Sequence, residues 1–265
     1  MNKLIEIKGL NKIFPIRKGF FNRQVGGVKA VNNISLDIYK GETLGLVGES
    51  GCGKSTAGRC IPGLINPTSG SIYYNGENII HPANIQKYRS KLQIIFQNPY
   101  SSLNPRMSVR EILEEPLIIN KTVPRNQINK HIDEFMNLVG LSSAALNRYP
   151  HEFSGGQRQR IGIARALILK PDFIVADEPV SALDVSIQAQ IINLLEDIKK
   201  ELGLTYLFIS HDLSVVRHVS NRTAVMYLGE IVEIAPAGSL FITPQHQYTK
   251  ALLSSVPVAD PKAGK

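Results

Sequence analysis

With 265 residues, 43% of them hydrophobic and 20% charged, the chain can bury a sizeable core and is not a disordered protein. It has no run of about eighteen apolar residues, and its start lacks the apolar segment of a secretory signal, so we expect a cytoplasmic protein. The net charge of +8 favours acidic partners, but the basic residues are scattered rather than gathered into an aromatic-interleaved stripe, so nucleic-acid binding is not expected.

The N-terminal part predicts a small antiparallel sheet followed by a buried strand. Leu4 to Ile7 and Ile34 to Ile38 alternate apolar and polar side chains, as antiparallel strands with one solvated face do. Thr43 to Val47 is an apolar run, which is typical of a strand covered on both faces in a parallel sheet.

A phosphate-binding loop follows that strand. Gly48 to Thr56 fits the spacing G-x-x-x-x-G-K-[ST] between a strand and a helix, a placement that argues against a mere glycine-rich turn. Glycines let the backbone curl so that successive amides point at phosphate oxygens, and the helix adds its positive end. We expect Lys54 to neutralise the β- and γ-phosphates, Ser55 to bind Mg²⁺ and Thr56 to reach the α-phosphate. The predicted nucleotide contacts in the loop are Gly48, Glu49, Ser50, Gly51, Cys52, Gly53, Lys54, Ser55 and Thr56.

The middle of the chain predicts a helical insertion. Leu92 to Phe96 resembles a strand and ends at Gln97, whose amide oxygen can reach Mg²⁺ or the attacking water, although a polar strand end alone is uninformative. From about residue 98 to residue 151 the periodicity becomes helical, most clearly in Val109 to Leu117 and Ile128 to Val139.

Two carboxylates follow the next buried strand, Phe173 to Ala176, at the edge where open parallel sheets bind ligands. Asp177 is expected to hold Mg²⁺ through water, and Glu178 to polarise the water that attacks the γ-phosphate. Without the phosphate loop, an ordinary surface pair would be the better interpretation.

A helix and a further strand complete a βαβ unit. Asp184 can cap the helix and Gly203 can end it, and the strand Leu204 to Ile209 follows. His211 lies just beyond that strand and can hydrogen-bond the γ-phosphate, although a lone histidine there is more often structural. Ile231 to Ala235 predicts a short strand, and we expect the last residues of the chain to be mobile.

A last motif identifies the family. Phe153 to Arg160 contains Ser-Gly-Gly-Gln, a second helix start suited to anions. Together with the phosphate loop, Gln97, Asp177-Glu178, Ser181 to Asp184 and His211, in this order, it makes the chain resemble the ATP-binding cassette ATPases over nearly its whole length. The resemblance implies an α/β fold of the P-loop NTPase type: a RecA-like parallel sheet core with an N-terminal antiparallel β-subdomain and an inserted α-helical subdomain.

The resemblance also implies domain boundaries and roles. It assigns residues 1–97 and 155–235 to the nucleotide-binding core, 98–154 to the helical subdomain and 236–265 to a C-terminal extension. In that family two ATPs are sandwiched in a head-to-tail dimer, and the helical insertion, with Gln97 at its hinge, couples nucleotide state to a membrane partner. The loop around Asp184 touches the opposite subunit, and residues acting on the other subunit's ATP are Ser154, Gly155, Gly156 and Gln157.

The family stacks adenine on an aromatic residue of the N-terminal sheet. Phe14 fits this role best, while Phe20 and Phe21 compete because the stretch from Arg17 to Gly27 is longer than the usual connection.

A narrower resemblance, carried by Phe96 to Pro105 and Gln247 to Leu253, is to the oligopeptide and dipeptide importer ATPases, which include nickel and glutathione systems. Their usual His-Pro-Tyr-Thr is His-Gln-Tyr-Thr at 246–249. Some members carry cysteines for an iron–sulfur cluster after that segment. Here the two cysteines are Cys52 and Cys60, so we expect no cluster and interpret both as packing residues in a reducing compartment.

The predicted function is that of the ATP-hydrolysing subunit of a peptide importer, using ATP and Mg²⁺ and peripheral on the cytoplasmic face of the inner membrane. Its expected partners are a second ATPase subunit, identical or paralogous, two transmembrane permease subunits and, indirectly, an external solute-binding protein. The expected catalytic residues are Glu178, His211, Lys54 and Gln97, and the expected metal ligands are Ser55, Gln97 and Asp177.

Three alternatives stay open. The same subunit can serve a nickel, metal-chelate or glutathione importer. A soluble cassette protein acting on nucleic acid or ribosomes usually carries two cassettes or a coiled-coil insertion. A P-loop kinase would leave the segment 154–157 without a role.

Overall fold

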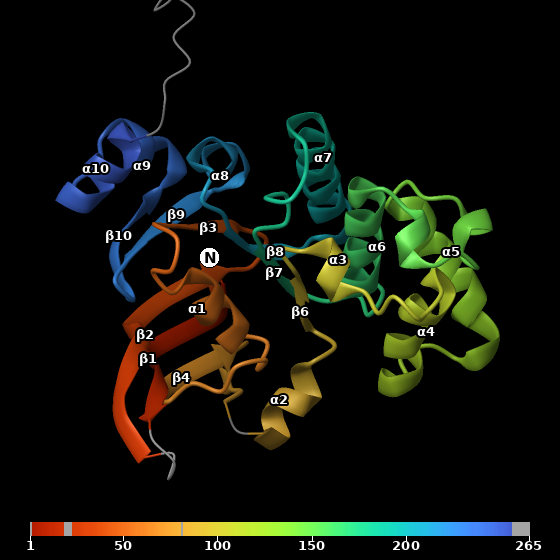
Figure 1. Cartoon of the computed structure of the whole chain (residues 1–265), viewed down its shortest axis with the longest axis horizontal. Coiled ribbons are helices and arrows are strands. Elements are labelled where there is room, and N and C mark those ends of the chain that lie inside the picture. Colours follow the sequence, from red (N-terminus) through yellow and green to blue (C-terminus); the bar gives the residue numbers. More distant parts are fainter. Residues whose placement is uncertain (1, 19–22, 81, 256–265) are drawn as a thin grey trace, which may run out of the picture.

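The computed structural model describes residues 2–18, 23–80 and 82–255. Figure 1 shows two sheets and a group of helices at one end of the molecule. Phe20, Phe21 and the last ten residues, on which sequence-based expectations were placed, lie outside the described residues.

The larger sheet is the predicted parallel core. Its six strands run in the order β10-β9-β3-β8-β7-β6, all parallel except β10, which is antiparallel to β9. They are β3 (Thr43–Val47), β6 (Leu92–Ile95), β7 (Phe173–Asp177), β8 (Thr205–Ile209), β9 (Arg222–Tyr227) and β10 (Glu230–Pro236).

The central strands are apolar throughout because each face of the sheet meets a different core. Along β7, Phe173 and Val175 face the core shared with the N-terminal sheet and α1. Ile174 and Ala176 face the core shared with the inserted helices. Side chains alternate between the faces of a strand, so burial on both sides requires the continuous apolar run that the sequence shows.

The smaller sheet is antiparallel, as predicted. Its order is β2-β1-β4-β5, and Ile5 pairs with Ile38 and Ile7 with Leu36. The strands are β1 (Lys3–Lys18), β2 (Arg23–Tyr39), β4 (Ser69–Tyr74) and β5 (Glu77–Asn78). The first two are much longer than the alternating segments that predicted them.

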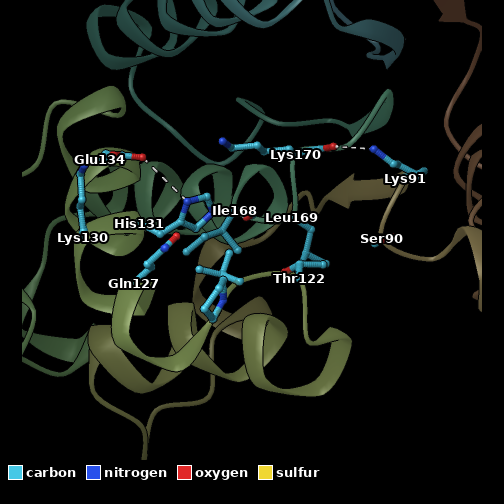
Figure 2. Close-up of a pocket in the computed structure, with 12 residues that line it drawn as sticks. Ser90, Lys91, Thr122, Gln127, Lys130, His131, Glu134, Ile168, Leu169 and Lys170 are labelled. Carbon is cyan, nitrogen blue, oxygen red and sulfur yellow. Dashed lines mark hydrogen bonds and ion pairs between the residues drawn. The ribbon is translucent and has the colours of Figure 1, made fainter.

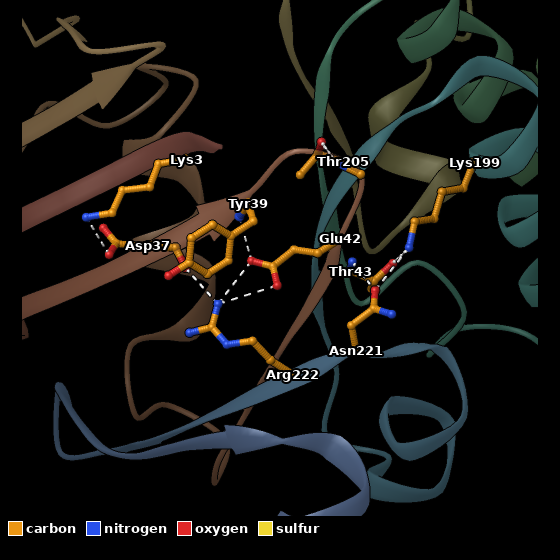
Figure 3. A network of polar contacts seen from close by, with 10 residues as sticks. Lys3, Asp37, Tyr39, Glu42, Thr43, Lys199, Thr205, Asn221 and Arg222 are labelled. Atoms are coloured by element: carbon orange, nitrogen blue, oxygen red, sulfur yellow. Dashed lines mark hydrogen bonds and ion pairs between the residues drawn. The ribbon is translucent and has the colours of Figure 1, made fainter. Parts of the chain in front are cut away.

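A polar network joins the two sheets (Figure 3). Glu42, only 8% exposed, accepts a hydrogen bond from the Tyr39 amide at 2.6 Å and forms an ion pair with Arg222 at 3.1 Å. The Arg222 guanidinium also lies 5.1 Å from the centre of the Tyr39 ring. Nearby, Asn221 accepts a hydrogen bond from the Thr43 amide at 2.8 Å. A buried carboxylate is tolerated because it is both paired and hydrogen-bonded.

The helices complete the layers. The α-helices are α1 (Lys54–Cys60), α2 (Pro82–Tyr88), α3 (Pro99–Ser102), α4 (Val109–Asn120), α5 (Ile128–Leu138), α6 (Gly155–Leu167), α7 (Val185–Leu202), α8 (Leu213–Val219), α9 (Ala237–Ile242) and α10 (Gln247–Ser254). Short 3₁₀ segments occupy Arg125–Gln127, Ser143–Ala145 and Pro150–Glu152. Among the described residues, none of the helices has the length and apolar character needed to cross a membrane.

The predicted helical insertion is confirmed in α4 and α5, which pack against each other and against α6, away from the N-terminal sheet (Figure 1). The short helix α3 packs against α6. Ser108 and Glu111 close a capping box at the start of α4. The helix continues through Pro116 to Asn120, past its predicted end.

The helix α7 differs from its prediction in one detail. Asp184 occupies the N-cap position, but its side chain makes no capping hydrogen bond, and only its backbone carbonyl accepts from the first turn. Gly203 ends the helix in the left-handed conformation, as predicted.

Candidate functional site

A cavity of about 510 Å³ opens at the carboxyl edge of the parallel sheet. Because β3, β6, β7 and β8 are parallel, the segments that follow them meet at this edge. The cavity is lined by Ala30, Ser50, Gly51, Gly53, Lys54, Ser55, Thr56, Gln97, Glu178 and His211. Sequence reasoning named all of these except Ala30, which comes from β2 of the smaller sheet.

The loop between β3 and α1 depends on its glycines. Gly48 and Gly53 have φ values of +150° and +109°. A Cβ atom at Gly48 would lie 2.1 Å from the Met226 carbonyl oxygen, and one at Gly53 would lie 1.9 Å from the Ala30 carbonyl oxygen. Only glycine can take this backbone path against its neighbours, which leaves the loop amides beside the cavity.

Lys54 is poised under the loop. Its side chain is buried, and Nζ donates to the carbonyl oxygens of Gly48 at 2.7 Å and Glu49 at 2.8 Å. Cys52 Sγ, at 3.8 Å, is a further weak acceptor. A buried ammonium held by these neutral acceptors can exchange them for phosphate oxygens, which carry the opposite charge.

Asp177 at the end of β7 is fully buried and bound on both oxygens. One oxygen accepts from the Ser55 hydroxyl at 2.7 Å, and the other faces Arg59, with Nη2 at 2.9 Å and Nε at 3.1 Å. Sequence reasoning missed Arg59. The available signal was its position one turn after Ser55 on the same helix, which directs both side chains to one side.

The pair Asp177 and Ser55 fits a magnesium ion. Mg²⁺ takes a few protein oxygens together with water and substrate phosphates, rather than a full protein cage. The described residues contain no group of three or more His, Cys, Asp or Glu side chains arranged to hold a metal by themselves, so phosphate oxygens would have to complete the coordination.

Glu178 is held by two neighbours on one of its oxygens. Gln97 Nε2 donates to Oε2 at 2.7 Å, and His211 Nδ1 lies 3.2 Å from the same atom. The described residues make no hydrogen bond to the other oxygen, Oε1. Glu178 also takes a left-handed backbone conformation, φ +48°, with its amide donating to the Ile209 carbonyl at 2.9 Å. Such an unfavourable conformation in a non-glycine residue is common where a side chain must be aimed at a ligand.

The Ser-Gly-Gly-Gln segment lies outside this cavity and begins α6. Ser154 and Gln157 form a capping box: the Ser154 hydroxyl accepts from the Gln157 amide at 3.3 Å, and the Gln157 side chain accepts from the Ser154 amide at 3.1 Å. Both residues are exposed. At Gly156, a Cβ atom would lie 2.6 Å from Ile187 Cγ2, so glycine lets α6 approach α7 closely.

Phe14 is also outside the lining of the cavity. It lies on β1, 40% exposed, with Lys12 Nζ 5.0 Å from the centre of its ring. Both cysteines are buried, in agreement with a packing role. Burial raises the pKa of Cys60 to about 11.

A second cavity, of about 660 Å³, lies where the helical insertion meets the segments before β6 and β7 (Figure 2). It is bounded by the turn between α4 and α5, by α5, and by the segments before β6 and β7, and includes Lys91, Lys130 and Lys170. His131 in its wall is 8% exposed, with Nε2 bonded to the Ile168 carbonyl at 2.8 Å. Sequence reasoning did not predict this cavity.

Comparison with known proteins agrees with the geometry. The sequence profile of the family described as ABC transporter matches residues 31–181, and that of the oligopeptide/dipeptide transporter C-terminal region matches 232–265. The oligopeptide transport ATP-binding protein AppF of Bacillus subtilis is 55% identical over 258 residues, 96% of this chain and 78% of the relative. The dipeptide transport ATP-binding protein DppF of Haemophilus influenzae is 51% identical over 260 residues, 97% of this chain and 79% of the relative.

Solved structures give the same answer. An ATP-binding cassette determined as a dimer in a post-hydrolysis state, bound to ADP and Pi, superposes with a TM-score of 0.77 at 29% identity. The match covers 88% of this chain and 98% of the cassette, so the expected P-loop fold is confirmed. The profile match and these relatives, together with the phosphate loop and the acidic pair, show that the chain belongs to the ABC transporter family.

Proposed function

We propose that this chain binds and hydrolyses ATP as the ATP-binding subunit of an importer that takes up peptides. The observation that carries the proposal is the convergence of Lys54, Glu178 and His211 on one cavity at the carboxyl edge of the sheet. The names of the oligopeptide and dipeptide transport relatives support the choice of solute.

Within the cavity, the loop amides and Lys54 would hold the phosphates. The Lys54 ammonium would exchange the carbonyls of Gly48 and Glu49 for β- and γ-phosphate oxygens. Ser55 and Asp177, with the Gln97 amide oxygen, would hold Mg²⁺. When bound, that ion would neutralise charge on the phosphates.

Glu178 is the proposed general base. Gln97 and His211 hold its Oε2 and so fix the direction of Oε1, which can accept a proton from a water aligned with the γ-phosphate. His211 can also turn its ring toward the γ-phosphate as charge develops there. Positioning and electrostatic stabilisation supply most of the catalysis in phosphoryl transfer.

We infer that two chains, identical or paralogous, close on two ATPs. The exposed start of α6, with Ser154, Gly155 and Gly156, offers a positive helix end to the γ-phosphate held by the other subunit. Val185, next to Asp184, is 82% exposed in the single chain. A second subunit that covered this surface would bury its apolar side chain. The dimeric cassette among the structural neighbours supports this arrangement.

We further propose that the helical subdomain, residues 98–154, meets a membrane subunit, while 1–97 with 155–235 form the core and 236–265 an extension. The cavity in Figure 2 lies where the insertion meets the core, so a segment seated there would contact both parts. A chain docked in this way would be peripheral on the cytoplasmic face of the membrane, with the solute-binding protein on the other side.

The test of the proposed function is phosphate release by Glu178→Gln. The variant keeps the size and one hydrogen-bonding oxygen but loses the base, so release of phosphate should fall at least about a hundredfold. ATP binding should persist, and ATP should drive the variant into dimers, measured by light scattering.

Glu201→Gln, an exposed change on α7, is the matched control and should hydrolyse ATP like the unmodified chain. Undiminished hydrolysis by Glu178→Gln would remove Glu178 as the base. A phosphorylated acceptor in place of free phosphate would identify a kinase instead.

A further inference from the structure

The segment after β10 folds back onto the larger sheet, and several hydrogen bonds fix its position there. The Glu233 carboxylate accepts hydrogen bonds from the backbone amides of Gln245 at 2.9 Å and His246 at 3.0 Å. Burial raises the pKa of Glu233, but the Thr249 side chain and these two amides lower it by more, so the pKa lies below its ordinary value. His246 Nδ1 then caps α10 by accepting from the Tyr248 amide at 3.2 Å. The start of α10 therefore has one position on the sheet, beside β9 and β10 (Figure 1).

This position accounts for the glutamine that stands here in place of the proline of the His-Pro-Tyr-Thr pattern. Gln247 is the first residue of α10, where the backbone N–H has no helical partner and proline is favoured but not required. The capping contact of His246 and the hydroxyl contact of Tyr248 use no side-chain atom of Gln247. Thr249 is fully buried.

Tyr248 extends from α10 to the phosphate loop. Its hydroxyl oxygen accepts a hydrogen bond from the Glu49 amide at 3.1 Å, across 199 positions of sequence. Its ring lies against the ring of Tyr227, with 4.2 Å between the centres. Tyr227 ends β9, which is the neighbour of β3, the strand that leads into the loop. Burial raises the pKa of Tyr248, so the hydroxyl stays neutral at physiological pH.

The amide that Tyr248 holds belongs to the same peptide unit that holds Lys54. The Glu49 N–H and the Gly48 C=O are on opposite sides of one planar group. The N–H donates to Tyr248, and the C=O accepts from Lys54 Nζ at 2.7 Å. Fixing the orientation of the N–H therefore fixes the orientation of the carbonyl.

A second contact holds the outer side of the loop. The Gly229 amide, in the turn between β9 and β10, donates to the Cys52 carbonyl at 3.0 Å. The Asn32 amide in turn donates to the Gly229 carbonyl at 2.8 Å. The loop is thus held from behind at Glu49 and at Cys52, while Ser50, Gly51 and Gly53 line the cavity. A loop already held in its binding geometry loses less entropy when phosphate binds.

We propose that Tyr248 is a positioning residue for the phosphate loop: its hydroxyl holds the Gly48–Glu49 peptide so that Lys54 and the loop amides are arranged for ATP before ATP arrives. This role rests on the proposed binding of ATP. Through Tyr248, the C-terminal segment would become part of the proposed nucleotide site, although the phosphate loop lies in the first quarter of the sequence.

The test is Tyr248→Phe, which keeps the ring against Tyr227 and removes only the hydroxyl. The dissociation constant for MgATP, from titration of a fluorescent ATP analogue, should rise about three- to tenfold, as expected for the loss of one neutral hydrogen bond. The KM for hydrolysis should rise by the same factor with kcat within about twofold, because the contact lies away from the reacting atoms. Hydrogen exchange of the Glu49 amide should speed up selectively.

Tyr227→Phe is the matched control, because it removes the hydroxyl of the adjacent ring, which makes no hydrogen bond to the described residues. It should bind ATP like the unmodified chain. Unchanged ATP affinity in Tyr248→Phe, a fall in kcat alone, or equal losses in both variants would overturn the role of Tyr248. Failure of the unmodified chain to bind ATP in the same titration would instead overturn the proposed function.

Discussion

Two cavities of the molecule, the one at the carboxyl edge of the parallel sheet and the one in Figure 2, differ in how they are made. The cavity at the carboxyl edge, about 510 Å³, is lined by loop backbone and by side chains that follow four strands of one sheet. The cavity between the helical insertion and the core, about 660 Å³, is larger, and its lining includes three lysines and comes from segments far apart in sequence.

The difference shows that volume was not the property by which we chose the proposed nucleotide site. The smaller cavity contains a glycine-built loop, a buried lysine, and carboxylates with fixed partners, which together match the charge of a triphosphate with Mg²⁺. The larger cavity is lined by three lysines and Glu134, and its lining residues include no glycine. A pocket with a few convergent polar groups on rigid elements is the expected form of a ligand-binding site.

We expect Arg59→Met, a change behind the carboxyl-edge cavity, to reduce stability more than a substitution in the second cavity. It leaves the fully buried Asp177 with the Ser55 hydroxyl but without its cation. Because the Arg59 side chain is 37% exposed, we expect the free energy of unfolding to fall by about 1–3 kcal/mol, less than for a completely buried pair. Urea unfolding without nucleotide measures it.

Arg59→Lys keeps the charge and should lose less stability than Arg59→Met. Equal stability of the methionine variant and the unmodified chain would mean that Asp177 does not depend on this partner.

Lys130→Glu in the second cavity should have the smallest effect on the isolated chain. Lys130 is exposed and far from the phosphate loop, so the dissociation constant for ATP should stay within about twofold and the free energy of unfolding within about 0.5 kcal/mol. The reversal of charge should weaken copurification with a membrane partner. A large loss of ATP affinity would show that the two cavities are not separate sites.

Sequence patterns named all but one of the residues that line the cavity at the carboxyl edge, because the parts of this cavity are local in sequence. The loop, the strand before Asp177 and the strand before His211 are each short contiguous segments, and the parallel sheet alone brings their ends together. The N-terminal strands and the helices α4 and α5 were also predicted from periodicity.

The parts that sequence reasoning missed depend on packing between distant segments. Arg59 reaches Asp177 only because α1 lies against β7. Tyr248 reaches the Glu49 amide only because α10 folds beside β9. The strands β4, β5 and β9 are short and carry weak patterns of their own. Asp184 occupies the predicted cap, but the direction of its side chain was not fixed by its position.

The most direct measurement is a crystal structure of the chain with Mg²⁺ and a non-hydrolysable ATP analogue. The triphosphate should lie in the cavity at the carboxyl edge, with Lys54 Nζ moved from the Gly48 and Glu49 carbonyls to phosphate oxygens. Nucleotide bound elsewhere, or Lys54 still on those carbonyls beside a bound triphosphate, would contradict the proposed site.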